Sequence, residues 1–206
     1  MRIGIIGSGN IGGTLARLLA GAGHDVVIAN SRGPESLAGL VAELGDRATA
    51  ATPAGAAAAG EVVIVAIPFT KYTELPATAL AGRIVVDANN DWSGAGGGEL
   101  SSSEVIAATM PGAVVVKAFN TIHYAHLREQ GTPAGTPGRR AIPIAGDDAA
   151  AKATVAALID EIGFDVYDVG SLADGRRIEP GSPAFNVGLT RDEIAAALAR
   201  TSPGNR

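Results

Sequence analysis

Three glycines near the N-terminus have the spacing of a phosphate-binding turn. Gly7, Gly9 and Gly12 form the pattern G-x-G-x-x-G directly after the apolar residues 3–6, and an amphipathic stretch follows. In a strand-turn-helix unit, the first glycine allows a tight turn and the second lets backbone approach a pyrophosphate. The third lets the helix pack against the strand, and the free N–H groups of that helix hold the phosphates. The pattern predicts a dinucleotide site, in which Ser8 and Asn10 can add hydrogen bonds. The alternative is a glycine turn without a ligand.

The end of the second apolar run decides which dinucleotide is expected. Asn30, Ser31 and Arg32 follow residues 26–29, and Asn30 lies 18 residues beyond the last glycine of the turn. In NAD-binding chains a carboxylate at about this point binds the 2′-hydroxyl of the ribose. The three residues found here would not repel a 2′-phosphate, and the guanidinium offers a planar pair of donors. We expect NADP(H); the alternative is that Arg32 is a solvated charge and Ser31 a helix cap.

The carboxyl ends of three further apolar runs are expected to line the nicotinamide half of the crevice, because ligands of open parallel sheets bind there. Ile67 and Pro68 would form an apolar wall. Asn89 and Asn120 are suited to ribose hydroxyls or a carboxamide, although each could be a turn residue instead. The same three chain segments add the predicted contacts Ala66, Ala118 and Phe119.

No side chain is singled out as catalytic. His123 and Thr121 are candidates for contact with the hydride acceptor or for its proton balance, and the alternative for His123 is a structural or surface histidine. His123 and His126 are three residues apart, but no third ligand is close in sequence, so we expect no metal. Trp92 could stack on a planar ring or cap the core. His24 is expected to be structural.

These residues lie in an alternation of short strands and helices. Nearly continuous apolar runs predict strands covered on both faces, at residues 3–6, 26–29, 62–67, 84–87, 114–118, 141–145 and 164–169, with a short edge strand at 48–50. Helices are predicted at residues 11–22, 35–44, 54–59, 70–80, 102–109, 149–162 and 191–199. The alternation predicts an α/β fold with a doubly wound parallel sheet, the Rossmann fold, and a small C-terminal appendage.

We expect one compact unit. Residues 1–130 would form the NADP(H)-binding core, and residues 139–206 an extension that completes the sheet and the acceptor cleft, after a loop rich in Gly, Pro and Thr. The glycine-rich residues 93–98 are the expected mobile loop.

The bulk composition excludes several classes of protein. The 206 residues are 47% hydrophobic and 18% charged, which suits a folded domain. A net charge of −5 argues against a nucleic-acid surface. The absence of cysteine excludes disulfides, thiolate metal sites and cysteine nucleophiles, and it is consistent with a reducing compartment. The start does not have the pattern of a signal peptide, and no apolar run is long enough to span a bilayer. We expect a cytoplasmic protein with no membrane contact.

Four stretches together resemble a known family. GSGNIGGTLARLLAGAGHDVVIANSRGPESL, VVIVAIPF, IVVDANN and VVVKAFNTIH are similar to the NADPH-binding core of the deazaflavin (coenzyme F420)-dependent NADP reductases. The same core occurs in the oxidoreductase domain of the six-transmembrane metalloreductases. The similarity covers most of residues 1–130 and continues weakly through 139–145, 164–170 and 175–183.

The resemblance implies a function and its site residues. The phosphates would bind at Gly7, Ser8, Gly9, Asn10, Ile11 and Gly12, and the 2′-phosphate at Ser31 and Arg32. A hydride would pass between NADP(H) and a deazaflavin stacked on the nicotinamide, in a homodimer. The acceptor side carries no recognisable motif, so two alternatives stay open. One is an NADPH-dependent reductase of another small-molecule acceptor, namely a flavin, a ferric chelate or an imine; the other is a non-enzymatic NADP(H)-binding module. An imine reductase would need a longer helical C-terminal domain than the single helix expected at 191–199.

Overall fold

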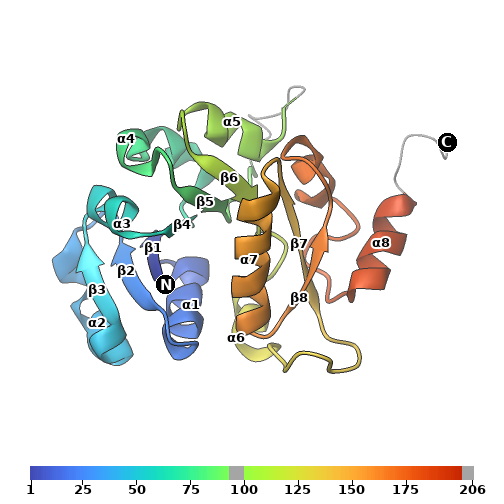
Figure 1. Cartoon of the computed structure of the whole chain (residues 1–206), viewed down its shortest axis with the longest axis horizontal. Coiled ribbons are helices and arrows are strands. Elements are labelled where there is room, and N and C mark those ends of the chain that lie inside the picture. Colours follow the sequence, from blue (N-terminus) through green and yellow to red (C-terminus); the bar gives the residue numbers. More distant parts are fainter. Residues whose placement is uncertain (93–99, 201–206) are drawn as a thin grey trace.

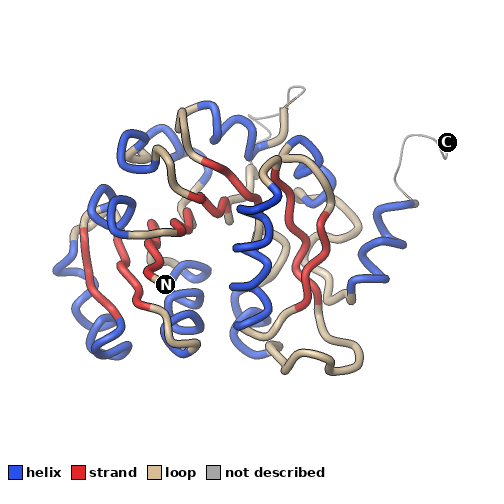
Figure 2. Tube along the Cα trace, in the orientation of Figure 1, coloured by secondary structure: helices blue, strands red, loops and turns tan. Residues whose placement is uncertain are grey.

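The computed structural model describes residues 1–92 and 100–200, so the predicted loop at 93–98 lies outside the described residues. Within them, eight strands form one sheet in the order β3-β2-β1-β4-β5-β6-β7-β8. Figure 2 shows these strands in red as a row with helices on both sides. The doubly wound α/β architecture predicted from the sequence is therefore confirmed. The strands are β1 (Arg2–Ile6), β2 (Asp25–Ala29), β3 (Ala48–Ala51), β4 (Val62–Val65), β5 (Ile84–Asp87), β6 (Val114–Lys117), β7 (Ala141–Gly146) and β8 (Asp165–Asp168).

The helices cover the sheet in two layers. They are α1 (Asn10–Gly21), α2 (Ala38–Leu44), α3 (Pro53–Ala59), α4 (Ala77–Leu80), α5 (Ser102–Ala108), α6 (Tyr124–Glu129), α7 (Ala149–Glu161) and α8 (Arg191–Ala199), with the 3₁₀ helices η1 (Pro34–Leu37), η2 (Gly45–Arg47), η3 (Phe69–Glu74) and η4 (Ala173–Ile178). One face carries α1, α2, α6 and α7, whose core includes Leu15 and Val155. The other face carries α3, α4 and α5, with Leu80 and Ile106 buried. Both faces of the central strands are therefore buried, as expected for strands that are continuous apolar runs.

Two predicted helices are broken in the structure. The stretch predicted at 70–80 is instead η3 followed by α4, because Pro76 lacks an N–H and forces Leu75 into an extended conformation (ψ 141°). The stretch predicted at 35–44 begins with the tighter turn of η1 before α2, behind Pro34. Helices α6 and η4 were not predicted, and β4 ends at Val65, two residues earlier than expected.

Strand β7 does not follow the expected parallel pairing. It runs antiparallel to β6, and its last residues, Ala145 and Gly146, pair with Lys117 and Val116 at the end of β6. The chain therefore continues past the carboxyl end of β6, turns through α6 and a long loop, and comes back. For β7 to run parallel to β6, the connection would first have to return to the amino ends of the strands.

The residues from 139 onward extend the same sheet. Strands β7 and β8 are parallel to each other and lie between α7 and α8 (Figure 1). Arg139 anchors the start of β7, where its guanidinium binds Asp160 at 2.5 Å and Asp165 at 2.9 Å. Because β7 begins beyond the end of β6, this part of the chain stands beside the carboxyl edge of the sheet.

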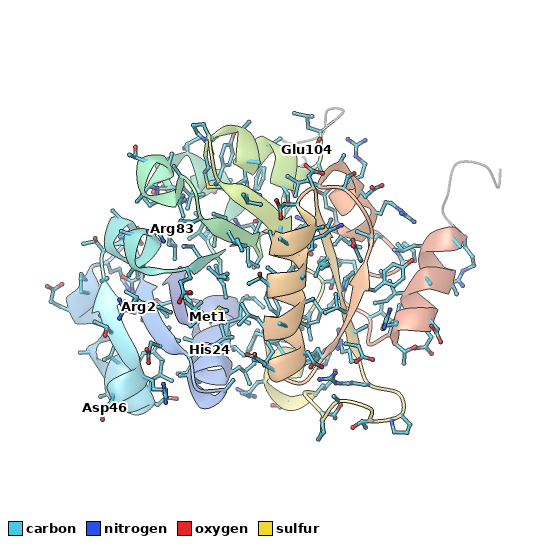
Figure 3. All side chains as sticks on the ribbon, in the orientation of Figure 1. Met1, Arg2, His24, Asp46, Arg83 and Glu104 are labelled. Carbon is cyan, nitrogen blue, oxygen red and sulfur yellow. The ribbon has the colours of Figure 1, made fainter. Side chains whose placement is uncertain are left out.

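At the amino ends of the strands, His24 makes contacts that stabilise the fold. His24 precedes β2 and accepts from the N-terminal amine of Met1 at 3.3 Å; both residues are labelled in Figure 3. His24 also pairs with Glu161 at 2.6 Å. The structural role predicted for His24 matches these contacts. Among the described residues, no helix has the length and apolar character needed to cross a membrane.

Candidate functional site

Two adjoining cavities lie beyond the carboxyl ends of β1, β2, β4 and β5. The larger has a volume of about 550 Å³ and is lined by Gly9, Asn10, Ile11, Ala66, Ile67, Pro68, Phe69, Thr70, Ala88, Asn89, Asn90, Asp91 and Trp92. The smaller has about 450 Å³ and is lined by Ile6, Gly7, Ser8, Gly9, Asn30, Ser31, Arg32, Pro53, Ala66, Ile67, Pro68, Lys71, Glu74 and Leu75. The four residues common to both are Gly9, Ala66, Ile67 and Pro68. Together the cavities form one crevice at the edge where α/β sheets bind ligands.

The glycine turn connects the two cavities. Gly7 has φ 113°, and a Cβ on it would lie 2.1 Å from the Ala66 carbonyl oxygen. A Cβ on Gly12 would lie 1.8 Å from the Gly7 oxygen, so α1 can approach the strand only without a side chain there. A Cβ on Gly9 would meet nothing within 4 Å, because this glycine faces the open crevice. The first turn of α1 carries no acidic residue. Its free N–H groups and open backbone fit a pyrophosphate.

Asn30 lines the smaller cavity, and its amide also organises the strand end. Its Nδ2 donates to the Ser8 hydroxyl at 3.1 Å and to the Ser36 hydroxyl at 2.9 Å. Its Oδ1 accepts from the backbone N–H of Arg32 at 2.9 Å. Asn30 therefore fixes the loop that carries Ser31 and Arg32 to the phosphate turn.

Two chain segments bring cations to the smaller cavity. Ser31 and Arg32 are exposed and line it, and within the described residues the Arg32 side chain makes no hydrogen bond or ion pair. Ser31 does not cap the next helix, since η1 starts after Gly33 without a side-chain cap. Lys71 of η3, which was not predicted as a site residue, lines the same cavity and pairs with Glu74 at 2.6 Å. The arrangement suits a dianion such as a 2′-phosphate.

The larger cavity combines an apolar wall with one unpaired donor. Ile67 and Pro68 form the wall, as predicted from their place after β4. Asn89 accepts from the backbone N–H of Ile67 through Oδ1 at 2.9 Å. Its Nδ2 is buried and has no partner in the described part of the chain. A buried unpaired donor is costly unless a ligand supplies the acceptor.

Trp92 lies at the rim of the larger cavity. Its side chain is 73% exposed, so it does not cap the core. The indole meets the ring of Phe185 edge-on, with centroids 5.6 Å apart. An exposed aromatic face beside a cavity is available to a flat ligand.

The segment after β6 lies outside the walls of these two cavities. The residues concerned are Ala118, Phe119, Asn120, Thr121 and His123. Asn120 donates to the Ile178 carbonyl at 2.7 Å and so joins the core to η4. Phe119 is buried with φ 63°, an unusual conformation for a side chain of this size. His123 is exposed and accepts from the Ala125 N–H at 3.4 Å, capping α6. The cofactor contacts and catalytic roles predicted for this segment stay predictions.

A buried ion pair that was not predicted from the sequence lies next to Asn89. Asp87 ends β5 and Lys117 ends β6, and their side chains are fully buried with Nζ and Oδ2 3.6 Å apart. The available signal was a single charge at the end of each of two apolar runs. Among the described residues, no cluster of three or more His, Cys, Asp or Glu side chains is placed to hold a metal ion.

Comparison with known proteins agrees with this geometry. Residues 2–91 match the family described as NADP oxidoreductase, coenzyme F420-dependent. A solved structure of a putative F420-dependent NADP reductase from Arthrobacter sp. FB24 is 33% identical, with a TM-score of 0.74 over 85% of this chain and 87% of that one. A hypothetical protein from Sinorhizobium meliloti is 36% identical, with a TM-score of 0.80 over 92% of this chain and 95% of that one.

A curated relative is larger. Metalloreductase STEAP3 of Rattus norvegicus is 37% identical over 181 residues, which is 86% of this chain. The chain spans 36% of the length of that metalloreductase.

Proposed function

The chain belongs to the family of coenzyme F420-dependent NADP oxidoreductases, and we propose that it transfers a hydride between NADP(H) and a deazaflavin coenzyme. The observation that carries the proposal is the two-part crevice. One end offers an exposed guanidinium, and the other offers an apolar wall and a single unpaired amide donor. The glycine turn lies between them.

The smaller cavity supports a preference for NADP(H). The 2′-phosphate would lie between Arg32 and Lys71, which reach the cavity from two different segments. Phosphate oxygens could replace Glu74 as the partner of Lys71, since that pair is exposed and therefore weak. No carboxylate occupies the strand end where one would select NAD(H).

The larger cavity supports a nicotinamide with one face against the protein. Ile67 and Pro68 would cover one face of the ring, while Asn89 fixes its rotation. The pyrophosphate would cross at Gly9, which belongs to both cavities. The acceptor would then approach the open face, beside the exposed ring of Trp92.

The chemistry needs few side chains. When bound, NADPH supplies a hydride, and a deazaflavin that takes it up also gains one proton from water, leaving NADP⁺. The residues of this chain position the two rings and keep water away from the transfer path. No general acid or base is required within the crevice, so Thr121 and His123 are assigned no step.

A second candidate function is reduction of a ferric chelate, favoured by the 37% identity to a metalloreductase. A hydride carries two electrons and each ferric ion accepts one, so a bound flavin would have to take the hydride and pass the electrons on singly; each NADPH would then reduce two ferric ions and release one proton. The same crevice would hold the NADPH.

The proposal is tested by mixing the purified protein with oxidised deazaflavin and either NADPH or NADH. We expect the deazaflavin absorbance to fall rapidly with NADPH and much more slowly with NADH. Unchanged absorbance, in a preparation shown to bind NADPH, would remove the deazaflavin as acceptor. Ferric-chelate, flavin and imine assays on the same preparation would then separate another reductase from a binding module.

A further inference from the structure

A charged pair is buried at the strand ends next to Asn89, which lines the larger cavity. Asp87 and Lys117 occupy neighbouring positions on β5 and β6, and neither side chain is exposed. Lys117 Nζ donates to the hydroxyls of Ser102 at 3.0 Å and Ser103 at 3.1 Å. Ser103 in turn donates to Asp87 Oδ2 at 2.5 Å. Burying two charges is expensive, and an apolar pair of the same volume is often at least as stable. The pair therefore calls for an explanation other than stability.

The contacts of this pair converge on Asn89. Its backbone N–H donates to Asp87 Oδ1 at 3.0 Å, and its carbonyl accepts from Lys117 Nζ at 3.4 Å. Its side-chain Oδ1 accepts from Ile67 N at 2.9 Å. Because Ile67 N–H can only donate, the amide oxygen must face it, which leaves Nδ2 as the one unpaired group of Asn89.

We infer that Asp87 and Lys117 are positioning residues that hold Asn89 with its Nδ2 directed to the carboxamide oxygen of the nicotinamide. The inference rests on the proposed function. Asn89 lies in the wall of the larger cavity, and its unpaired donor matches an oxygen that only accepts. Because the donor is already fixed, ligand binding does not pay the entropy cost of ordering it. The nicotinamide is then held in one orientation.

The competing explanation is a structural one. Lys117 also touches η4, where a Cβ on Gly175 would lie 3.1 Å from Lys117 Cδ, so the pair could simply join the core to the extension. A structural join and a positioning role differ in which part of the cofactor they affect. Only positioning acts on the nicotinamide end alone.

The experiment compares three ligands on folded protein. NADP⁺ has every group, 2′-phospho-ADP-ribose lacks the nicotinamide, and 2′,5′-ADP also lacks the second ribose and one phosphate of the pyrophosphate. The variant Asp87→Asn/Lys117→Met removes both charges at similar volume, which leaves no unpaired interior charge. The variant Asn89→Asp keeps the acceptor for Ile67 N–H and the ion pair, but loses the donor. Dissociation constants and thermal midpoints are measured for each.

In both variants we expect the Kd of NADP⁺ to rise about tenfold, with the other two ligands within about twofold of wild type. Equal losses for all three ligands would mean a structural join and would overturn the inference. Weaker binding of 2′-phospho-ADP-ribose as well would mean that Asn89 donates to the second ribose, which would contradict the carboxamide assignment. Unchanged NADP⁺ binding by Asn89→Asp would overturn it even if the double variant did not fold. Wild-type protein that binds NADP⁺ but does not reduce deazaflavin would refute only the proposed acceptor.

Discussion

At the scale of single residues, Arg32 and Lys71 approach the smaller cavity from segments almost forty positions apart. Arg32 follows β2 and has no partner among the described residues, whereas Lys71 already has Glu74. A phosphate group would therefore gain more from Arg32 than from Lys71.

The Arg32→Asp substitution should change cofactor preference. We expect the Kd of NADPH to rise roughly 10- to 150-fold, because a charge-assisted hydrogen bond contributes about 1.5–3 kcal/mol. NADH should bind as well as before or better, since a carboxylate can accept from a 2′-hydroxyl. Arg47→Asp is the matched control, because Arg47 pairs with Asp25 at the other edge of the sheet. Equal losses for both nucleotides would refute the 2′-phosphate assignment.

Lys71→Met should have a smaller effect of the same kind. We expect NADPH to bind roughly three- to fivefold more weakly and NADH to be unaffected, because exposed charges contribute less than about 1 kcal/mol. Glu74→Gln should act in the opposite direction, since it frees Lys71 from its partner. Titrations at low and high salt check this, because screening should shrink both differences.

The residues found from sequence are those whose role is set by their own neighbours along the chain. Gly7, Gly9 and Gly12 form a local turn, and Arg32 follows a strand end at a characteristic distance. Lys71 and Lys117 could not be found in this way, because their roles depend on which strands lie side by side.

At the scale of elements, the turn into α1 relies on space as well as on flexibility. Gly9 has φ −73°, a conformation open to any residue, and a side chain there would project into the crevice. The same helix ends at Gly21, where a Cβ would also meet nothing within 4 Å.

This pair of glycines allows a matched test. Gly9→Ala should leave the thermal midpoint nearly unchanged but weaken NADPH at least tenfold, because its Cβ occupies the path of the pyrophosphate. Gly21→Ala should leave NADPH binding unchanged and stabilise the protein by about 0.5–1 kcal/mol, since alanine is favoured over glycine in helices. Thermal denaturation and binding titrations check both. Normal NADPH binding by folded Gly9→Ala would contradict the assigned path.

The stability of helix α8 should depend on pH, because Glu193 in its first turn is titratable. Thr190 donates to Glu193 from its backbone N–H at 2.8 Å and from its hydroxyl at 2.9 Å, and these bonds lower the pKa of Glu193 below its ordinary value. The folded pKa lies below the unfolded one, so this contribution is complete above about pH 4.5 and is lost as pH falls through the folded pKa. Hydrogen exchange in α8 should show a difference between wild type and Glu193→Gln that shrinks toward low pH. A constant difference would contradict this role.

The helices and strands whose bounds are set by a local sequence pattern were predicted well. Helix α8 was predicted at its observed bounds, and the edge strand β3 at 48–50 is present. The antiparallel direction of β7 was missed because it depends on where α6 and the following loop lie, which no local pattern encodes.

At the scale of the whole molecule, the last two strands bring a second segment to the carboxyl edge of the sheet. Asn186 donates to the Thr121 carbonyl, and the Ser102 N–H donates to Glu179, so the extension contacts the loops behind the crevice. An acceptor would enter between this extension and the nucleotide. The homodimer and the cytoplasmic location implied by the sequence stay predictions, and light scattering of the purified protein would check the first.

The proposed function requires direct hydride transfer across the crevice. The most direct measurement uses NADPH carrying deuterium on one face of nicotinamide C4, with mass analysis of the reduced deazaflavin. Because Ile67 and Pro68 would cover one face of the ring, we expect deuterium to reach the deazaflavin from one of the two labelled forms and not from the other. Equal transfer from both forms, loss of the label to water, or no reduction by a protein that binds NADPH would contradict direct hydride transfer in this crevice.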